Sequence, residues 1–280
     1  MRLSSDGGIL LLIMENPYFA LHQEFRDAGA EVLISSGQAC VAFGIATFSK
    51  DGDWIIRDNE ASCNAVLSVL GKHGAMYRLG APLHPGWLCL GWTSHFEFRA
   101  HVGLRMRTDF CSRPPRVPLV DNLWSRAVKA AGLDVVDVES LIRLKQTRRQ
   151  RDYSIIGALA EVAGWEEDMP ELALQYLQDY DGLLRAVQRW PAEAAACERE
   201  AVRRLRDDAP RAEVVAAIAV EQDARIQEDQ ARIAAMQAKF EEYASQFGKL
   251  RSRWRRTGTP LPEQHRELVI EAESLRKGVL

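Results

Sequence analysis

The stretch TFSKDGDW, residues 47–54, places two aspartates one residue apart, directly before a run of apolar residues. Asp51 and Asp53 flank a glycine, and Asp-Gly is a common turn dipeptide, so one interpretation is a turn that enters a strand. In an extended chain, residues two apart point to the same face, so both carboxylates would share one side of a sheet. Two carboxylates this close repel each other unless a cation lies between them, so the second interpretation is half of a metal site.

The composition is that of an ordinary globular protein. The 280 residues are 47% hydrophobic and 27% charged, and the net charge of −3 shows that the chain as a whole is not a polycation. Five scattered cysteines without a CxxC pair favour reduced thiols over disulfides or a zinc site. The apolar part of GGILLLIMENPYF near the N-terminus has about six residues, whereas about 20 are needed to span a bilayer. We therefore expect a cytoplasmic protein without a signal peptide and without membrane contact.

The first part of the chain alternates short apolar runs with helical patterns. Asn16 and Pro17 form a helix start signal, and residues 104–111 alternate with a period of two, which is typical of a strand. Helices are predicted over residues 16–28, 37–45, 59–72, 121–131 and 137–163. Strands are predicted over 31–35, 53–57, either 88–92 or 95–99, and 104–111. This order predicts an α+β fold with a mixed sheet and flanking helices.

The texture changes near residue 165, after which Ala, Glu, Arg, Leu and Gln dominate. These strong helix formers predict an all-helical C-terminal region, with helical segments over 171–206, broken at Pro191, and over 211–247, and a final helix from Glu263. Apolar residues recur every seven positions in the second of these, which predicts a helical hairpin or a short coiled coil. We therefore expect two domains, 1–165 and 166–280, and helices in the second that bind either the acceptor or a partner protein.

A third acid on a neighbouring strand would complete a metal site with Asp51 and Asp53. Asp109 in the strand 104–111 is the candidate, although it could instead be a surface acid paired with Arg105 or Arg107. Mg²⁺ (or Mn²⁺) binds a few carboxylates together with phosphate oxygens and water. Two such ions align a hydroxyl that attacks a nucleoside triphosphate and neutralise charge on the leaving pyrophosphate.

Phosphate groups also need hydrogen-bond donors, and the segment Ser35-Ser36-Gly37-Gln38 offers them. It lies between the first predicted strand and the helix that follows. A small, glycine-containing turn at a helix N-terminus presents free backbone N–H groups and the positive end of the helix dipole.

The order of strand, Ser-Gly turn, short helix and S-K-D-G-D-W resembles the nucleotidyltransferase fold of the polymerase-beta-like superfamily. It is most similar to the minimal nucleotidyltransferases of bacterial abortive-infection and toxin–antitoxin systems. The residues that match the family pattern are Ser36, Gly37, Ser49, Asp51, Asp53 and Asp109. That group often carries a Lys and an Arg-x-Lys-Asp segment on a helix facing the nucleotide, to which residues 144–153 are similar. The resemblance covers residues 17–165 and assigns nucleotide binding to Lys145, Arg149 and Asp152.

Three positions depart from the family pattern. Gln38 stands where a second small residue is common, Gly52 stands where an aliphatic residue is usual, and Ala46-Thr47 replaces a frequent arginine. None of these changes removes an acid.

The resemblance implies a metal-dependent nucleotidyltransferase. It would move a nucleoside monophosphate from a nucleoside triphosphate to a hydroxyl of an RNA 3′ end, a protein side chain or a nucleotide. Asp51, Asp53 and Asp109 would bind Mg²⁺ (or Mn²⁺), with Asp109 also helping to activate the nucleophile, and a toxin or phage-defence role would follow. The alternative is a non-catalytic nucleotidyltransferase-like binding module that serves as an antitoxin or scaffold.

The run KLRSRWRR, residues 249–256, allows two interpretations. Its positive charges and Trp254 are suited to contact phosphates and stack on a base. A helix C-terminus also favours basic residues without any ligand. Both interpretations stay open at the level of the sequence.

Overall fold

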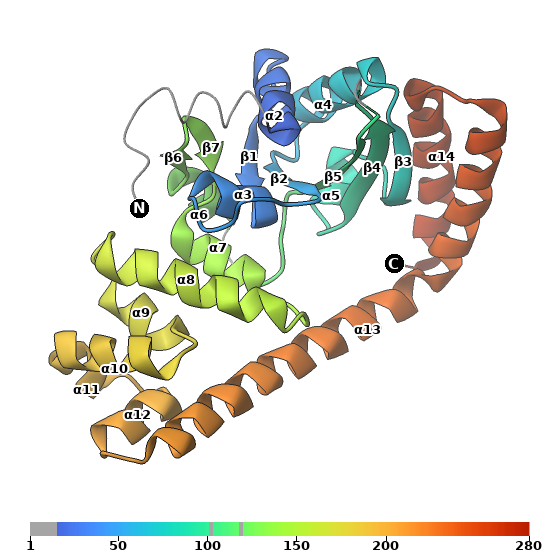
Figure 1. The fold of residues 1–280 in the computed structure, drawn as a ribbon. Coiled ribbons are helices and arrows are strands. Elements are labelled where there is room, and N and C mark those ends of the chain that lie inside the picture. Colours follow the sequence, from blue (N-terminus) through green and yellow to red (C-terminus); the bar gives the residue numbers. More distant parts are fainter. Residues whose placement is uncertain (1–15, 101–102, 118–119, 280) are drawn as a thin grey trace. The chain divides into compact units, whose positions relative to one another are not determined.

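The computed structural model describes residues 16–100, 103–117 and 120–279, so most of the N-terminal apolar run lies outside the described residues (Figure 1). The strands are β1 (Val32–Ser35), β2 (Gly52–Ile56), β3 (Met76–Gly80), β4 (Thr93–Arg99), β5 (Arg105–Cys111), β6 (Val128–Ala130) and β7 (Leu133–Val135). The helices are α2 (Pro17–Asp27), α3 (Ser36–Ala42), α4 (Glu60–Lys72), α5 (Pro85–Leu88), α6 (Val120–Ser125), α7 (Val138–Lys145), α8 (Arg151–Trp165), α9 (Pro170–Tyr176), α10 (Tyr180–Arg189), α11 (Pro191–Ala196), α12 (Glu200–Arg206), α13 (Arg211–Thr257) and α14 (Leu261–Val279). The α+β class is confirmed.

The strands form one mixed sheet in the order β3-β4-β5-β2-β1-β7-β6. β2 runs parallel to β5, and β1 runs parallel to β7, while the other neighbours are antiparallel. The sheet therefore places β2, which carries Asp53, between β1 and β5. The predicted strands 31–35, 53–57 and 104–111 are all present, and of the two alternatives 95–99 forms while 88–92 does not.

The chain divides into two compact units. The first combines the residues up to Val136 with those from Gln237 onward, and the second is Asp137–Met236. This division differs from the predicted domains 1–165 and 166–280. Amino-acid composition distinguishes helix-rich from mixed segments. It does not reveal that α14 and the last part of α13 pack with the sheet.

Local signals account for the start of the helices that flank the sheet. The Asn16 side chain accepts a hydrogen bond from the Tyr18 N–H at 3.0 Å, and Pro17 is the first residue of α2. The Asn59 side chain does the same for the Ser62 N–H at 2.8 Å, which caps α4. Such caps satisfy N–H groups that have no partner within the helix.

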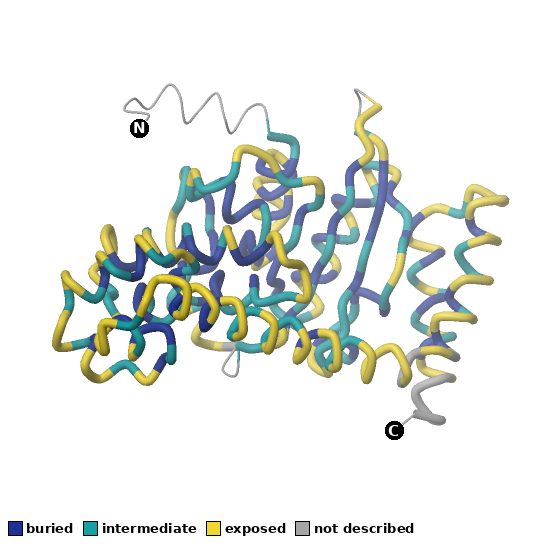
Figure 2. The backbone as a smooth tube through the Cα atoms, turned by 60° about the horizontal axis from the view of Figure 1, so that its bottom comes forward, coloured by how far each residue is buried: buried dark blue, intermediate teal, exposed yellow. Residues whose placement is uncertain are grey.

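The core forms around Trp54. Its ring stacks on Phe110 of β5 with 5.4 Å between ring centroids and meets the edge of Phe25 of α2 at 5.3 Å. These contacts pack α2 against β2 and β5, and buried residues lie both along the strands and in the helices (Figure 2). Because side chains alternate along a strand, Asp53 points to the face opposite Trp54.

The predicted helix 121–131 is wrong. α6 ends at Ser125, and the following residues form the hairpin β6–β7. Ala131 and Gly132 both have positive φ, at 49° and 78°, as the tight turn of a two-residue hairpin requires. β7 is added to the sheet beside β1, so tertiary pairing overrides the helical pattern of this segment. The strand β3 was not predicted.

The long predicted helices are interrupted. Residues 137–163 form α7 and α8 with a break at residues 146–150, and 171–206 forms the short helices α9 to α12. Pro170 and Pro191 are the first residues of α9 and α11, because proline lacks the N–H that a helix interior needs. α13 instead continues to Thr257, beyond its predicted end at residue 247.

α14 and the last part of α13 form a helical hairpin. The indole N–H of Trp254 in α13 donates to Glu267 of α14 at 2.6 Å, and Gln264 of α14 accepts from the Tyr77 N–H of β3 at 3.1 Å. The hairpin thus attaches to the edge of the sheet. Within the part of the chain that the structure describes, no helix has both the length and the apolar character needed to cross a bilayer.

The unusual glycine between the two aspartates is explained by this core. A Cβ atom at Gly52 would lie 2.4 Å from the Trp54 ring and 2.6 Å from the Tyr18 ring. We expect Gly52→Ala to lower the free energy of unfolding by about 1–3 kcal/mol, because both rings are buried. Urea unfolding measures this change.

Gly71 provides the matched control. It lies in helix α4, and a Cβ there meets no atom within 4 Å. Gly71→Ala is therefore expected to be neutral or to stabilise by about 0.4–1 kcal/mol. Equal effects of the two substitutions would contradict the assigned close packing at Gly52.

Candidate active site

Strand pairing brings two of the predicted acids together. Asp53 of β2 and Asp109 of β5 are register partners on adjacent parallel strands, and Asp51 directly precedes β2. Neighbouring strands are about 4.8 Å apart. Asp53 and Asp109, which are 56 positions apart in sequence, therefore lie side by side on one face of the sheet.

The loop that carries Asp51 is fixed by Gln38. The buried Gln38 side chain donates to the backbone carbonyls of Ser49 at 3.1 Å and Asp51 at 3.3 Å, and it accepts from Asn16 at 3.0 Å. This residue departs from the family pattern, and the structure gives it a definite task. It joins the start of α2 and the start of α3 to the aspartate loop.

The predicted phosphate turn also contacts the aspartate loop. A Cβ atom at Gly37 would lie 2.1 Å from the Ser49 hydroxyl, so only glycine allows this approach. The Ser49 hydroxyl donates to the Asp51 carbonyl at 3.2 Å, and Ser35 donates to the Asp53 carbonyl at 3.1 Å. Ser36 begins α3 with a φ of 52°, a conformation that non-glycine residues rarely adopt. The structure thus brings Ser36, Gly37, Ser49, Asp51 and Asp53 into one local assembly.

Asp109 is held by Arg78 and His95. The Arg78 guanidinium donates to it at 3.0 Å, and His95 Nδ1 lies 2.8 Å from the same oxygen. Burial raises the pKa of Asp109, but the hydrogen bond from His95 and the charge of Arg78 outweigh burial, so the pKa lies below its usual value. The sequence suggested Arg105 or Arg107 as the ion-pair partner of this acid, and that pairing is not the one found.

Asp51 presents a different environment. Its Oδ1 atom is buried without a hydrogen-bond partner among the described residues, and the Arg107 guanidinium is 3.7 Å away. A buried carboxylate oxygen without a donor is costly unless a cation compensates it. Arg107 is the cation beside this oxygen, at an ion-pair distance without a hydrogen bond, so a metal ion at Asp51 would share the oxygen with Arg107 or displace it.

The chemistry of these donors fits a hard divalent ion in part. Mg²⁺ is typically held by one or two carboxylates, with substrate phosphates and water completing its shell. Asp51 and Asp53 match that need, and the described residues contain no group of three or more acidic, His or Cys side chains arranged around one ion. Asp109 would join such a site only by giving up its contacts with Arg78 and His95.

Cys111 lies close to the same carboxylates. Burial raises the pKa of its thiol to about 12, and the charges of Asp53 and Asp109 act in the same direction. The thiol is therefore protonated at neutral pH and has little nucleophilic character.

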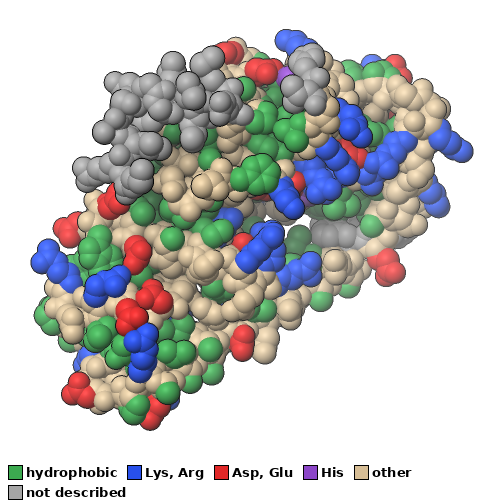
Figure 3. Space-filling view, in the orientation of Figure 1, with side chains coloured by type: hydrophobic (Ala, Val, Ile, Leu, Met, Phe, Trp, Pro, Cys, Tyr) green, Lys and Arg blue, Asp and Glu red, His purple; other side chains and the backbone are tan. Residues whose placement is uncertain are grey.

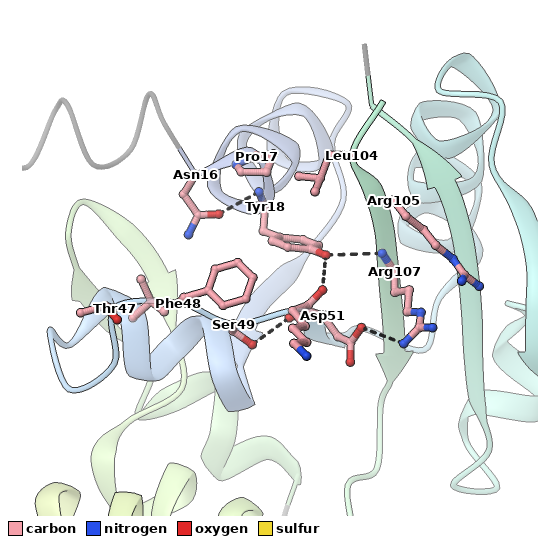
Figure 4. Close-up of a pocket in the computed structure, with 12 residues that line it drawn as sticks. Asn16, Pro17, Tyr18, Thr47, Phe48, Ser49, Asp51, Leu104, Arg105 and Arg107 are labelled. Carbon is pink, nitrogen blue, oxygen red and sulfur yellow. Dashed lines mark hydrogen bonds and ion pairs between the residues drawn. The ribbon is translucent and has the colours of Figure 1, made fainter. Parts of the chain in front are cut away.

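A pocket of about 680 Å³ opens beside Asp51 (Figure 4). The Tyr18 hydroxyl joins two of its walls, because it donates to the Lys50 carbonyl at 2.6 Å and accepts from the Arg107 N–H at 3.4 Å. The lining residues are Asn16, Pro17, Tyr18, Val41, Thr47, Phe48, Ser49, Lys50, Asp51, Leu104, Arg105 and Arg107. Phe48 is 69% exposed, so the pocket combines an accessible aromatic ring with three cationic side chains. Such a surface suits a nucleobase and its phosphates.

The basic tract 249–256 is anchored within the first unit. Arg251 donates to the buried carboxylate of Glu97 at 3.0 Å, and Arg255 also bonds it. Trp254 is 1% exposed, and its indole N–H donates to Glu267. Arg253 donates to the same carboxylate. The suggestion that Trp254 stacks on a nucleic-acid base is therefore wrong, because its ring is part of the core.

Glu97 is consequently a strongly ionised residue. Burial alone would raise its pKa, but hydrogen bonds from Arg105, Arg251 and Arg255 lower the pKa to about 2. Arg105 reaches it from β5, and the other two reach it from α13. One buried carboxylate thus joins β4, β5 and α13.

Lys145, Arg149 and Asp152 belong to the second unit. Lys145 is the last residue of α7, and α8 begins at Arg151, so the continuous helical face predicted for these residues does not form. Asp152 does fix Arg149, whose Nε donates to it at 3.0 Å, and Thr147 donates to the same oxygen. Contact of Lys145 and Arg149 with a triphosphate stays a prediction.

Several residues of the site were missed at the level of sequence. Tyr18, Arg78, His95 and Glu97 all act through partners that are distant in the chain, at separations from 14 to 158 residues. The alternation of charged residues along 104–111 indicated which face of the strand is polar. It could not indicate which residues of other elements pair with those side chains.

Comparison with known proteins does not identify a family for this chain. No family model matches the sequence, and no curated protein matches it. Function is therefore argued below from the geometry of Asp51, Asp53 and their surroundings.

The role of Gln38 can be tested by an apolar side chain of similar length. Gln38→Met removes the donors to Ser49 and Asp51 and leaves both carbonyls without this partner. We expect the free energy of unfolding to fall by about 1–3 kcal/mol, measured by urea unfolding. Gln23→Met, at an exposed position of α2, should change it by less than about 0.5 kcal/mol. Comparable losses in both variants would contradict the anchoring role.

The depressed pKa of Glu97 predicts a defined pH dependence. The stabilisation from ionised Glu97 is fully present above its unfolded pKa, near 4.5, and is lost as pH falls toward about 2. Unfolding free energies of the wild type and Glu97→Gln should therefore differ most above pH 5 and converge between pH 4.5 and 2. A difference that stays constant over this range would contradict the assigned ion pairs.

Proposed function

We propose that the protein is a metal-dependent nucleotidyltransferase. The observation that supports this most strongly is the pairing of Asp53 with Asp109 on adjacent strands, next to Asp51. The Gly37–Ser49 contact, which ties a Ser-Gly turn to the same loop, adds to it. In the proposed reaction an acceptor hydroxyl attacks the α-phosphorus of a nucleoside triphosphate, the bond to the β-phosphate breaks, and pyrophosphate leaves.

Each residue has a proposed task. Asp51 and Asp53 would hold Mg²⁺ (or Mn²⁺), which when bound neutralises the phosphates and lowers the pKa of the acceptor hydroxyl. Ser36, Gly37 and Ser49 would lie against the phosphates. Support for this arrangement comes from the Asp51 Oδ1 atom, which lies 3.7 Å from Arg107 but accepts no hydrogen bond among the described residues, and from the contact that joins the two loops.

The pocket beside Asp51 is the proposed place for the nucleotide. Phe48 offers an exposed ring to the base, and Arg105 and Arg107 offer guanidinium groups to the phosphates. The acceptor is an RNA, a protein side chain or a nucleotide, and a toxin or phage-defence role follows from the resemblance alone.

One observation favours a second candidate. Because Arg78 and His95 already bond Asp109, this acid would not be available to a metal ion, as expected of a chain that binds nucleotide without turning it over. In that case the chain would be a binding module or scaffold that acts through its helices. Nucleotide binding without transfer separates the two functions.

The test uses labelled nucleoside triphosphates, Mg²⁺, total cellular RNA and lysate. Wild-type protein should label an acceptor, and Asp51→Asn and Asp53→Asn should reduce labelling by at least about a hundredfold, because each removes a charged ligand. Asp58→Asn is the control, since Asp58 lies just after β2 and pairs with Arg113 at 3.3 Å. It should label like the wild type.

Two outcomes would count against catalysis. Labelling that survives in Asp51→Asn and Asp53→Asn would show that the chemistry lies elsewhere. Thermal stabilisation by a triphosphate and Mg²⁺ without any labelling would favour the binding module.

A further inference from the structure

A second charged cluster lies along the same strands, outside the aspartate edge. Glu97 of β4 accepts hydrogen bonds from Arg105 of β5 and from Arg251 and Arg255 of α13. One Glu97 oxygen receives both α13 arginines, and the other receives Arg105. Guanidinium groups from segments about 150 residues apart in sequence thus meet at one point.

The cluster carries more positive charge than its carboxylate can neutralise. Three guanidinium groups face one carboxylate, so two positive charges stay uncompensated within it. A single arginine would suffice to neutralise Glu97, and like charges held this close repel each other. Crowding of this kind is costly without a further anion.

The arginines retain donors for such an anion. Their side chains are 52%, 28% and 49% exposed for Arg105, Arg251 and Arg255, and each guanidinium has five N–H groups. The Nε of Arg251 is buried without a hydrogen-bond partner. An orphaned donor beside surplus positive charge indicates a place for an oxyanion.

The surroundings extend the positive surface. Arg99 is the register partner of Arg105, and Arg107 is the register partner of Glu97. Figure 3 shows Lys and Arg side chains gathered over β4, β5 and the adjoining end of α13. Because Arg105 and Arg107 also line the pocket, the cluster continues the pocket surface.

Attachment of α13 to the sheet does not by itself explain why three arginines bond one carboxylate. The Tyr243 hydroxyl already donates to the Gly80 carbonyl at 2.9 Å, and Trp254 and Gln264 are bonded within the hairpin and to β3. Phosphate groups suit this cluster, since their oxygens accept hydrogen bonds from several guanidinium groups at once and their negative charge compensates the excess positive charge.

We propose that Arg105, Arg251 and Arg255, aligned by Glu97, form a binding site for phosphate groups. The ligand is a phosphate chain, carried either by a polyphosphate or by the backbone of a nucleic-acid strand. Binding here needs no metal and no transfer reaction, and of its three arginines Arg105 also lines the pocket proposed for the nucleotide.

The experiment measures binding to the full chain by calorimetry and fluorescence anisotropy, with EDTA present. The probes are inorganic tripolyphosphate and a labelled single-stranded RNA oligonucleotide. Arg251→Gln and Arg255→Gln should each weaken binding about tenfold, because each removes a charge-assisted hydrogen bond. EDTA removes divalent ions, which keeps this test independent of metal-dependent catalysis.

Arg253→Gln is the matched control. Arg253 lies on the same helix and has the same charge, but it pairs with Glu267 instead of Glu97. Its binding constant should stay within about twofold of the wild type. Circular dichroism verifies folding of each variant, and Arg105→Gln on β5 replaces the helix variants if these do not fold.

The two probes distinguish the sources of phosphate. Arginine-dependent binding of RNA alone assigns the site to a nucleic-acid backbone, and binding of tripolyphosphate alone assigns it to a polyphosphate. Failure of both probes to bind would overturn the proposal. An equal loss in Arg253→Gln and Arg251→Gln would also overturn it, because general charge would then account for binding.

Discussion

The alternation of side chains along β2 is the constraint on which the rest of the site depends. Trp54 points into the core, where it stacks on Phe110 and meets Phe25, so the register of β2 cannot slip without exposing this ring. That register turns Asp53 to the opposite face and sets it beside Asp109. Packing of one aromatic side chain therefore fixes the position of the carboxylates, and Gly52 is small because the Trp54 ring covers it.

Sequence reasoning succeeded where the signals are local. Caps at Asn16 and Asn59, the apolar run of β1 and the period of two in β5 gave helices and strands close to those observed. The grouping of Ser36, Gly37 and Ser49 with the aspartates was likewise predictable, because few residues separate them. The hairpin β6–β7 was not, since its strand pairing beside β1 overrides a helical pattern.

The partners of the charged residues were beyond the reach of sequence. Arg78 and His95 bind Asp109, and Arg251 binds Glu97 from 154 residues away. Such pairs follow from the order of strands and from the docking of α13, neither of which periodicity reveals. Gln38 shows the same limit, because it departs from the family pattern and yet anchors the aspartate loop through backbone carbonyls that any residues could supply.

The geometry of β5 decides how the two charged clusters relate. Arg105 and Asp109 are four residues apart on this strand, which corresponds to about 13 Å between their Cα atoms. One phosphate group cannot contact both, whereas an extended chain of phosphates spans that length. Arg107 stands between them, 3.7 Å from Asp51 and in register with Glu97, so this strand places a cationic side chain next to each cluster.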